Sequence, residues 1–279
     1  MKKLKKLFVC SLLLSLSFCF FACGSAQKTI LVPNDGSNCT RALFLLEENG
    51  YIRLKDGVKP TDNLSDLDIA DSRGYNVKLV EAGLIPAQLK TGGENTLAVI
   101  NGNYALSAGI SVLKAIALEN AQGEAAKLYA NVLAVKAENE TNAKTLALKA
   151  ALESESCYNF IKSEFGGAVL PSFTPDNADI PAPETQNDEI TVAASSTPHA
   201  RILEHVKPLL EQKGWKLTIS VFDDYVLPNV AVFNGSLNAN FFQHVPFMNT
   251  YNAEKKADLV AVTAVHYEPF GLYDFSATK

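Results

Sequence analysis

The sequence predicts an α/β protein with parallel sheets covered by helices, and two observations favour this class. Short runs rich in β-branched residues alternate with longer segments of helical periodicity along most of the chain. The part that follows a signal-like start is long enough for one large domain or for two lobes with separate cores, and its size favours two lobes. We therefore expect two α/β lobes rather than a sandwich or a helical bundle.

The beginning of the chain is typical of a secretory signal. Four lysines precede an uncharged apolar run over residues 7–22, which is shorter than the roughly 20 residues that a membrane-spanning helix needs. The run ends in Phe20-Phe-Ala-Cys-Gly24, which predicts cleavage before Cys23 and attachment of lipid, including palmitate, to that cysteine. The alternative is an ordinary secretory signal with an incidental cysteine. We expect an exported protein, anchored by lipid to the periplasmic side of a bacterial membrane or to the cell surface.

Composition excludes one class of partner. The first 22 of the 279 residues hold four of the 25 lysines and arginines and none of the 30 acids, so the remaining 257 residues carry 21 basic and 30 acidic side chains. A surface of that charge argues against nucleic acid as a partner. Beyond Cys23 only Cys39 and Cys157 remain, and two isolated cysteines in an exported chain permit a disulfide without implying one.

Local patterns place the main elements. Thr197-Pro198 opens a helix with a cap residue followed by proline at the first helical position. A second helix is expected from about Cys39 to Asn49, and residues 142–165 carry one or two more. A stretch over residues 174–188, rich in proline and acids, has almost no bulky apolar residue and is predicted to be a linker. Buried strands are predicted at residues 29–32, 97–100, 132–135, 217–221 and 259–265.

Arg41 is a candidate for holding an anion. It is expected in the first turn of the helix that follows strand 29–32, where its guanidinium and free backbone N–H groups can face the same anion. Asn38, at the expected cap, adds an amide, and Asn101 directly follows strand 97–100, where ligands of open α/β sheets gather. Such groups suit the carboxylate of an amino acid, which is costly to leave unpaired in a closed cleft. The alternatives are that Asn38 only caps the helix, that Arg41 only makes a surface salt bridge, and that Asn101 is only a turn residue.

Aromatic side chains in the other half of the chain suit an apolar pocket. Tyr225, Phe242 and Phe247 can supply aromatic walls for the apolar side chain of a ligand. The simpler interpretation of each phenylalanine is core packing. His244 allows two interpretations in the same way, as a satisfied structural histidine or as a residue that faces a ligand.

No catalytic or metal-binding pattern carries a prediction. The chain has no Gly-x-Ser-x-Gly elbow, no Walker loop and no His-Glu-x-x-His string, so we predict that it is not an enzyme. Cys39 near Arg41 is interpreted as a small residue at a helix start rather than a nucleophile. A zinc site from His244, His266 and Glu268 is conceivable, but we predict no metal and no cofactor.

Five blocks of sequence together carry a resemblance to a known family. They are Asn34-Asp-Gly-Ser-Asn-Cys-Thr-Arg41, Val99-Ile-Asn-Gly-Asn-Tyr104, Asp223-Asp-Tyr-Val-Leu-Pro-Asn229, Asn238-Ala-Asn-Phe-Phe-Gln-His-Val-Pro-Phe247 and Val265-His-Tyr-Glu-Pro269. The chain resembles the methionine-binding lipoproteins of bacterial ABC importers, often called the MetQ or NlpA family. The resemblance implies a type II, two-lobed periplasmic-binding-protein-like fold, methionine held between the lobes, and an ABC permease as the partner of a monomeric lipoprotein.

The resemblance also assigns site residues. Phe247 stands where relatives commonly have tyrosine, so one hydroxyl is missing, and Glu268 is expected to help hold the ammonium group. The substrate-binding residues that we expect are Asn38, Arg41, Asn101, Tyr225, Asn240, Phe242, His244, Phe247 and Glu268.

The order of the blocks departs from the family, because there the aromatic and histidine block precedes the arginine block. This predicts a circularly permuted chain, in which the linker joins the family's usual ends and the new ends fall where the family crosses between lobes. A single covalent connection between the lobes would remain, which predicts lower affinity. The expected divisions are a signal (1–22), a tether (23–27), lobe II (28–109), a crossover (110–128), lobe I (129–173 and 189–273), the linker (174–188) and a tail (274–279).

A second class of function is left open by the sequence. A chain whose permutation has cost it transport coupling would act as a surface adhesin or antigen. Retention of Arg41 and Asn101 favours ligand capture over this alternative.

Overall fold

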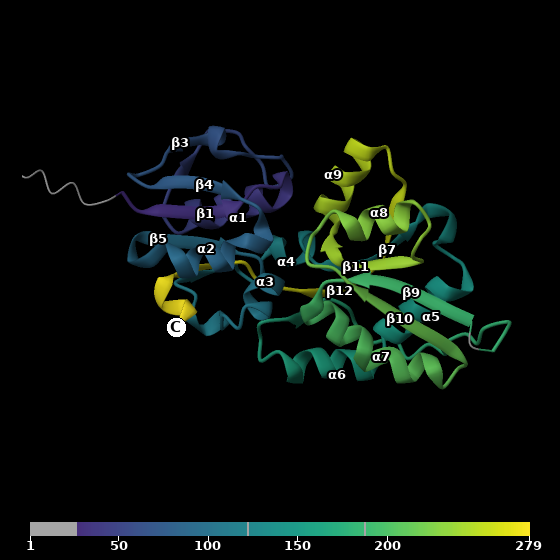
Figure 1. The fold of residues 1–279 in the computed structure, drawn as a ribbon. Coiled ribbons are helices and arrows are strands. Elements are labelled where there is room, and N and C mark those ends of the chain that lie inside the picture. Colours follow the sequence, from purple (N-terminus) through teal and green to yellow (C-terminus); the bar gives the residue numbers. More distant parts are fainter. Residues whose placement is uncertain (1–26, 122, 187) are drawn as a thin grey trace, which may run out of the picture.

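The computed structural model describes residues 27–279 except residues 122 and 187, so the predicted signal and Cys23 lie outside the described residues. Two mixed α/β lobes lie side by side, each on its own sheet (Figure 1). Within the described part of the chain, no helix has the length and apolar character needed to cross a membrane.

Lobe II contains a five-stranded sheet in the order β4-β1-β5-β13-β6. One face packs against α1, and the other packs against α2, α3 and the C-terminal turn at Phe275–Thr278. A small pair, β2 with β3, lies beside this sheet. The bounds are β1 Thr29–Pro33, α1 Gly36–Glu48, β2 Arg53–Leu54, β3 Ile69–Asp71, β4 Asn76–Val80, α2 Ile85–Gly92, β5 Thr96–Ile100, α3 Gly102–Ser107, β6 Ala117–Leu118 and β13 Gly271–Asp274.

Lobe I contains a six-stranded sheet in the order β10-β9-β11-β7-β12-β8. Helices α5, α6 and α7 cover one face, and α8 and α9 cover the other (Figure 1). Short helix α4 (Glu124–Leu128) precedes this sheet. The bounds are β7 Asn131–Lys136, α5 Ala143–Leu152, α6 Glu155–Glu164, β8 Leu170–Pro171, β9 Asp188–Ala194, α7 Arg201–Glu211, β10 Trp215–Val221, α8 Leu227–Phe233, β11 Ala239–His244, α9 Val245–Lys255 and β12 Leu259–Tyr267.

The expectation of parallel sheets holds for only part of each lobe. Strands β1, β4 and β5 are parallel, as are β9, β10 and β11, but β7 is antiparallel to both β11 and β12. The reason is connectivity, because β7 leads away from the lobe boundary and β12 leads back to it.

All five predicted strands are confirmed at β1, β5, β7, β10 and β12.

The chain crosses between the lobes twice, so the expectation of a single covalent connection is wrong. The first crossing, residues 119–130, joins β6 to β7, and the second, residues 268–270, joins β12 to β13. The predicted lobe boundaries at residues 109 and 273 are corrected accordingly, since β6 and β13 both belong to the sheet of lobe II. Neither short strand has a pattern that reveals such a distant partner.

The predicted linker follows the surface of lobe I. The indole Nε1 of Trp215 donates a hydrogen bond to the carbonyl of Pro181 at 2.7 Å. The side chain of Ile180 packs against the core of the lobe. The linker has too few apolar residues to form a core of its own, and these contacts hold it against lobe I.

Candidate ligand-binding site

The lobes meet around a small cavity. Its volume is about 20 Å³, which is room for roughly one water molecule. Several of its residues follow the carboxyl ends of strands, where ligands of α/β sheets usually bind. The lining consists of Asn38, Arg41, Asn101, Gly102, Asn103, Asn131, Tyr225, Phe242, Gln243, His244, Phe247, Glu268 and Phe270.

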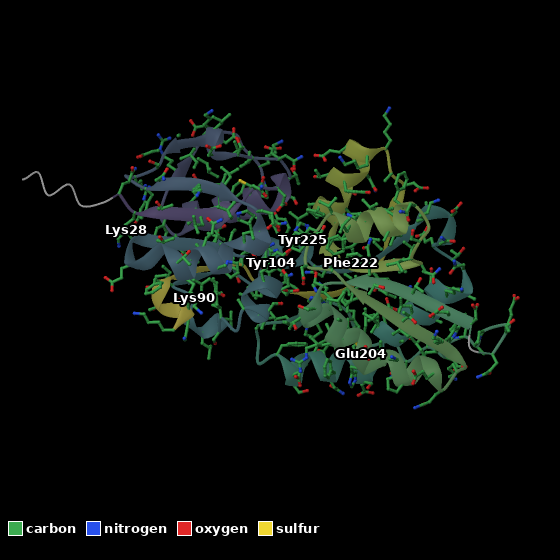
Figure 2. All side chains as sticks on the ribbon, viewed as in Figure 1. Lys28, Lys90, Tyr104, Glu204, Phe222 and Tyr225 are labelled. Atoms are coloured by element: carbon green, nitrogen blue, oxygen red, sulfur yellow. The ribbon has the colours of Figure 1, made fainter. Side chains whose placement is uncertain are left out.

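Two tyrosines mark the contact between the lobes, Tyr104 from lobe II and Tyr225 from lobe I (Figure 2). Their ring centroids are 4.9 Å apart. The Tyr104 hydroxyl donates to the carbonyl of Asp223 at 3.0 Å, and the Tyr225 hydroxyl donates to Oδ1 of Asn103 at 2.6 Å. These contacts hold the cleft in a closed arrangement.

Helix α1 begins earlier than predicted, which changes the position of Arg41. Asp35 is the N-cap, and its Oδ1 accepts from the backbone N–H of Asn38 at 3.0 Å. Arg41 therefore lies in the second turn, and the prediction of Asn38 as cap with Arg41 in the first turn is wrong. Aspartate and asparagine are equally good cap residues, so the local pattern did not distinguish these positions.

Arg41 is buried and makes several hydrogen bonds through Nε and Nη2. Its Nε and Nη2 donate to the carboxylate of Glu119 at 2.8 and 2.6 Å, and Nη2 also donates to the carbonyl of Glu268 at 2.6 Å. The guanidinium carbon lies 4.0 Å from the ring centroid of Phe270 and 4.6 Å from that of Tyr129. Burial disfavours the charge, but attraction to Glu119 outweighs it and raises the pKa of Arg41 above its ordinary value. The arginine thus stays cationic.

Asn38 joins the two lobes through its amide oxygen. Oδ1 accepts from Nδ2 of Asn101 at 3.1 Å and lies 3.2 Å from Nε2 of His244. Nδ1 of His244 accepts from the backbone N–H of Phe247 at 3.2 Å, which leaves the ring proton on Nε2. Burial and, next, the charge of Arg41 lower the pKa of His244 well below its ordinary value. Oδ1 of Asn101 is buried without a hydrogen-bond partner among the described residues.

Three aromatic rings from lobe I form one wall of the cavity. The centroid of the Tyr225 ring lies 5.8 Å from that of Phe242 and 5.7 Å from that of Phe247, and the two phenylalanine centroids are 6.0 Å apart. These distances are typical of tilted and edge-to-face packing. The predicted rings therefore lie together, on the opposite lobe from Arg41.

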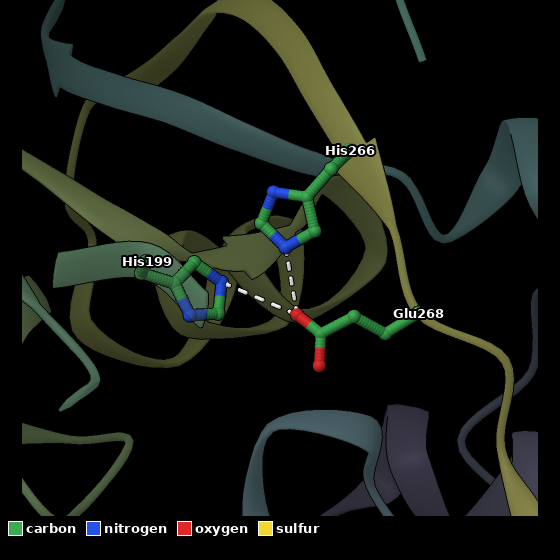
Figure 3. A group of neighbouring side chains, drawn as sticks. All are labelled: His199, His266 and Glu268. Carbon is green, nitrogen blue, oxygen red and sulfur yellow. Dashed lines mark hydrogen bonds and ion pairs between the residues drawn. The ribbon is translucent and has the colours of Figure 1, made fainter. Parts of the chain in front are cut away.

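Glu268 belongs to a buried cluster with two histidines (Figure 3). Its Oε1 lies 2.7 Å from Nε2 of His266 and 3.6 Å from Nε2 of His199, which also lies 3.0 Å from Oδ1 of Asn131. Burial raises the pKa of Glu268 to about 7 and lowers that of each histidine to about 3. A side chain at Gly102 would meet Glu268, since an added Cβ would lie 2.5 Å from it.

These three residues also group as metal ligands would, with ligand atoms within 4.8 Å of one another. Metal-bound histidines ordinarily donate their second ring N–H to an acceptor. Here Nδ1 of His199 and Nδ1 of His266 are buried without a partner in the described part of the chain. A metal on the two Nε2 atoms would leave two buried donors unsatisfied, so we interpret the cluster as a hydrogen-bonded network.

The structure does not bring Asn240 to the cavity, and that prediction is corrected. Its Nδ2 donates to Oδ1 of Asn229 at 2.9 Å, and its Oδ1 accepts from Nε2 of Gln243 at 2.9 Å. The amide is engaged in a network with Pro228 and Asn229 of α8, because Asn240 lies near the start of β11 whereas the cavity residues lie nearer its end. The other eight expected residues line the cavity.

Several cavity residues were missed from sequence. Asn131 is the first residue of β7, and Phe270 lies between β12 and β13; the sequence did not predict the exact ends of these strands. Gln243 belongs to the matched block Asn238–Phe247, from which other residues were predicted as site residues. Glu119, which supports Arg41, had no local signal. Asn103 was not predicted as a site residue, although it belongs to the matched block Val99–Tyr104 just beyond the end of β5, and that signal could have found it.

Both remaining cysteines are free and buried. Burial raises the pKa of the Cys39 thiol and of the Cys157 thiol to about 12. Thiols of that kind are poor nucleophiles at neutral pH, which agrees with the interpretation of Cys39 as a packing residue.

Comparison with known protein families decides the classification. A family described as NlpA lipoprotein matches residues 25–173 and 190–279. The chain belongs to the NlpA lipoprotein family. The matched segments stop and resume on either side of the predicted linker in this NlpA lipoprotein.

Individual relatives match over shorter stretches. The methionine-binding lipoprotein MetQ of Bacillus subtilis is 44% identical over 91 residues, 32% of this chain and 33% of its own. The D-methionine-binding lipoprotein MetQ of Escherichia coli is 30% identical over 142 residues, 50% of each chain. The chain thus spans only a third to a half of the length of these relatives. The function named for them is binding rather than catalysis, as predicted for the family.

A similar solved structure is that of a nutrient-binding protein from Burkholderia cenocepacia bound to methionine. It is 36% identical, covers 53% of this chain and 59% of its own, and has a TM-score of 0.48.

Proposed function

We propose that this NlpA lipoprotein is the substrate-binding component of an ABC importer and captures methionine between its lobes. The observation that carries the proposal is the pairing of unlike walls on one cavity. A buried arginine and amides from lobe II face aromatic rings from lobe I. Relatives named as methionine-binding support this assignment.

The polar wall suits the charged head of an amino acid. A carboxylate needs a fixed cation and amide donors, and Arg41 with Asn38 offers both. The ammonium group needs acceptors, and Oδ1 of Asn101 lacks a partner among the described residues while the carboxyl group of Glu268 lines the same cavity. Lobe II and the second crossing therefore hold the head.

The aromatic wall suits the apolar tail. A thioether gains about 0.3 to 1.5 kcal/mol from each contact with an aromatic ring. Tyr225, Phe242 and Phe247 form such a surface, and His244 closes its edge. Lobe I thus selects the side chain.

Binding requires the lobes to separate. The cavity of about 20 Å³ is too small for methionine, so the ligand enters an open form and the lobes then close around it by a hinge motion. The closed form would present a matched surface to an ABC permease. We further propose that Cys23 carries lipid and holds the protein on the membrane that contains this permease.

We also propose that the chain is a circular permutant of the family. Residue Thr29 of β1 pairs with Thr96, and residue Asp274 of β13 pairs with Leu97. These strands flank β5, and neighbouring strands lie about 4.8 Å apart, so the two positions are separated by roughly 10 Å. Joining them and opening the chain at the linker would restore the family's order with little rearrangement.

A rearranged protein tests this proposal. Residues 189–279 would be joined through a short Gly/Ser segment to residues 28–173, and methionine affinity compared by calorimetry. Since both interlobe crossings persist in either order, we expect affinities within about threefold of each other. Failure of the rearranged chain to fold or bind would contradict permutation.

A thermal-shift panel of the twenty amino acids tests the ligand assignment. A ligand present at 100 times its Kd adds about 2.7 kcal/mol to stability, so methionine should raise the Tm selectively. Arg41→Lys should abolish the rise, because a lysine cannot replace the bidentate guanidinium. A flat panel for the wild-type chain would contradict the proposal and favour a surface adhesin.

A further inference from the structure

Glu119 collects hydrogen bonds from three separate parts of the protein. It lies at the start of the first crossing and is 8% exposed. Its Oε2 accepts from Nη2 of Arg41 and from the hydroxyl of Tyr267, both at 2.6 Å, and from the backbone N–H of Phe270 at 3.0 Å. Its own backbone N–H donates to the carbonyl of Phe270 at 3.0 Å.

These donors belong to both lobes and to the segment that connects them. Arg41 lies on α1 of lobe II, Tyr267 ends β12 of lobe I, and Phe270 belongs to the second crossing. One carboxylate therefore joins both crossings and the arginine at the point where the lobes are linked.

The same contacts fix the orientation of the guanidinium. Glu119 occupies Nε and Nη2, the carbonyl of Glu268 takes the second proton of Nη2, and aromatic rings lie against the guanidinium. Among the described residues, Nη1 is the guanidinium nitrogen for which no hydrogen bond is found. It is consequently the nitrogen left to serve a ligand.

We propose that Glu119 is a positioning residue, which presents Nη1 of Arg41 to the ligand's carboxylate when the two crossings adopt their closed geometry. This inference rests on the proposed function. A purely structural carboxylate would only neutralise a buried charge, and its loss would weaken the binding of every ligand equally. A positioning carboxylate instead sets the preference for ligands that carry a carboxylate.

The test compares methionine with methioninamide, which lacks the negative charge, by calorimetry on the wild-type chain, on Glu119→Gln and on Glu138→Gln. Glu138 is a matched control because it is a glutamate with an exposed side chain, 68% accessible, in an ion pair with Lys136. Hydrogen bonds to charged groups contribute roughly ten- to hundredfold. We expect the affinity ratio of methionine to methioninamide to fall at least about tenfold in Glu119→Gln and to stay unchanged in Glu138→Gln.

An unchanged ratio in a folded Glu119→Gln protein, with both affinities reduced together, would overturn the inference. If this variant does not fold, Tyr267→Phe removes one donor to Glu119 without unpairing a charge, and the ratio should fall about threefold, since the loss is that of one hydrogen bond. An unchanged affinity ratio in Tyr267→Phe would also overturn the inference. Failure of the wild-type chain to bind methionine would instead refute the proposed function.

Discussion

Two buried clusters of ionisable side chains flank the cleft, and burial affects them in opposite ways. In the Arg41–Glu119 pair, opposite charges meet with short hydrogen bonds, and the pKa of the arginine rises. In the cluster of His199, His266 and Glu268, burial shifts each pKa in the direction that favours the uncharged form, lowering it for the histidines and raising it for the glutamate. Two ring nitrogens have no partner among the described residues. Equal burial thus yields a permanent charge where a counter-ion is supplied and a proton-sensitive site where it is not.

Breaking the first cluster should have the largest effect. Arg41→Met leaves Glu119 buried without its cation, and removing one partner of a buried pair typically costs about 3 to 5 kcal/mol. Urea denaturation should show that loss. Arg41→Met combined with Glu119→Leu should recover most of the stability, because an apolar pair replaces both charges, without restoring methionine binding. An Arg41→Met protein as stable as the wild type would contradict the claim that Glu119 depends on Arg41 as its counter-ion.

The second cluster should make the protein sensitive to acid. His199 and His266 have pKa values of about 3 in the folded protein, below the ordinary 6.5. The unfolded chain takes up these protons as the pH falls below 6.5 and the native protein does not, so stability is lost between pH 6.5 and pH 3. Denaturation across this range should show that loss, and His266→Gln should reduce the slope by about one proton. A slope unaffected by the substitution would be contrary evidence.

Glu268 should oppose the histidines over part of that range. Its pKa is raised to about 7 from 4.5, so the folded protein holds a proton that the unfolded chain releases. This contribution is present below pH 4.5 and is lost as the pH rises through 7. Glu268→Gln should therefore steepen the acid dependence between pH 4.5 and 6.5 by about one proton, or about 1.4 kcal/mol per pH unit. A shallower pH dependence of stability in Glu268→Gln would contradict the raised pKa of Glu268.

A contact at the rim gives the smallest expected effect and a reference for the buried clusters. Tyr104→Phe removes only the hydrogen bond from its hydroxyl to the carbonyl of Asp223. Net hydrogen bonds of this kind contribute about 1 kcal/mol or less. Methionine affinity should fall less than about tenfold. A loss as large as that from Arg41→Met would mean that the rim rather than the buried pair controls closure.

The sequence was sufficient for features that local pattern defines. Apolar runs placed five strands correctly, and the strand ends and matched blocks pointed to residues such as Arg41, Asn101 and Phe242 that do line one cavity. These predictions succeeded because each depends on neighbours within a few residues.

Features that depend on distant partners could not be predicted in this way. Glu119 lies 78 residues from Arg41 and 151 from Phe270, and nothing near it in sequence indicates a buried ion pair. Strand β13 is defined by its pairing with the distant strands β5 and β6, so the second crossing between lobes was missed. The start of α1 was misplaced because Asp35 and Asn38 are both good caps.

The central claim is that one amino acid is held by its carboxylate in one lobe and by its side chain in the other. Calorimetry with methionine on the wild-type chain, Arg41→Lys and Phe242→Ala tests both halves together. We predict one binding site per chain and affinity at least about tenfold weaker in Arg41→Lys, which loses a charge-assisted contact. Affinity should be about two- to tenfold weaker in Phe242→Ala, which loses a sulfur–aromatic contact. Absence of binding to the wild-type chain, or equal affinity in all three proteins, would contradict the claim.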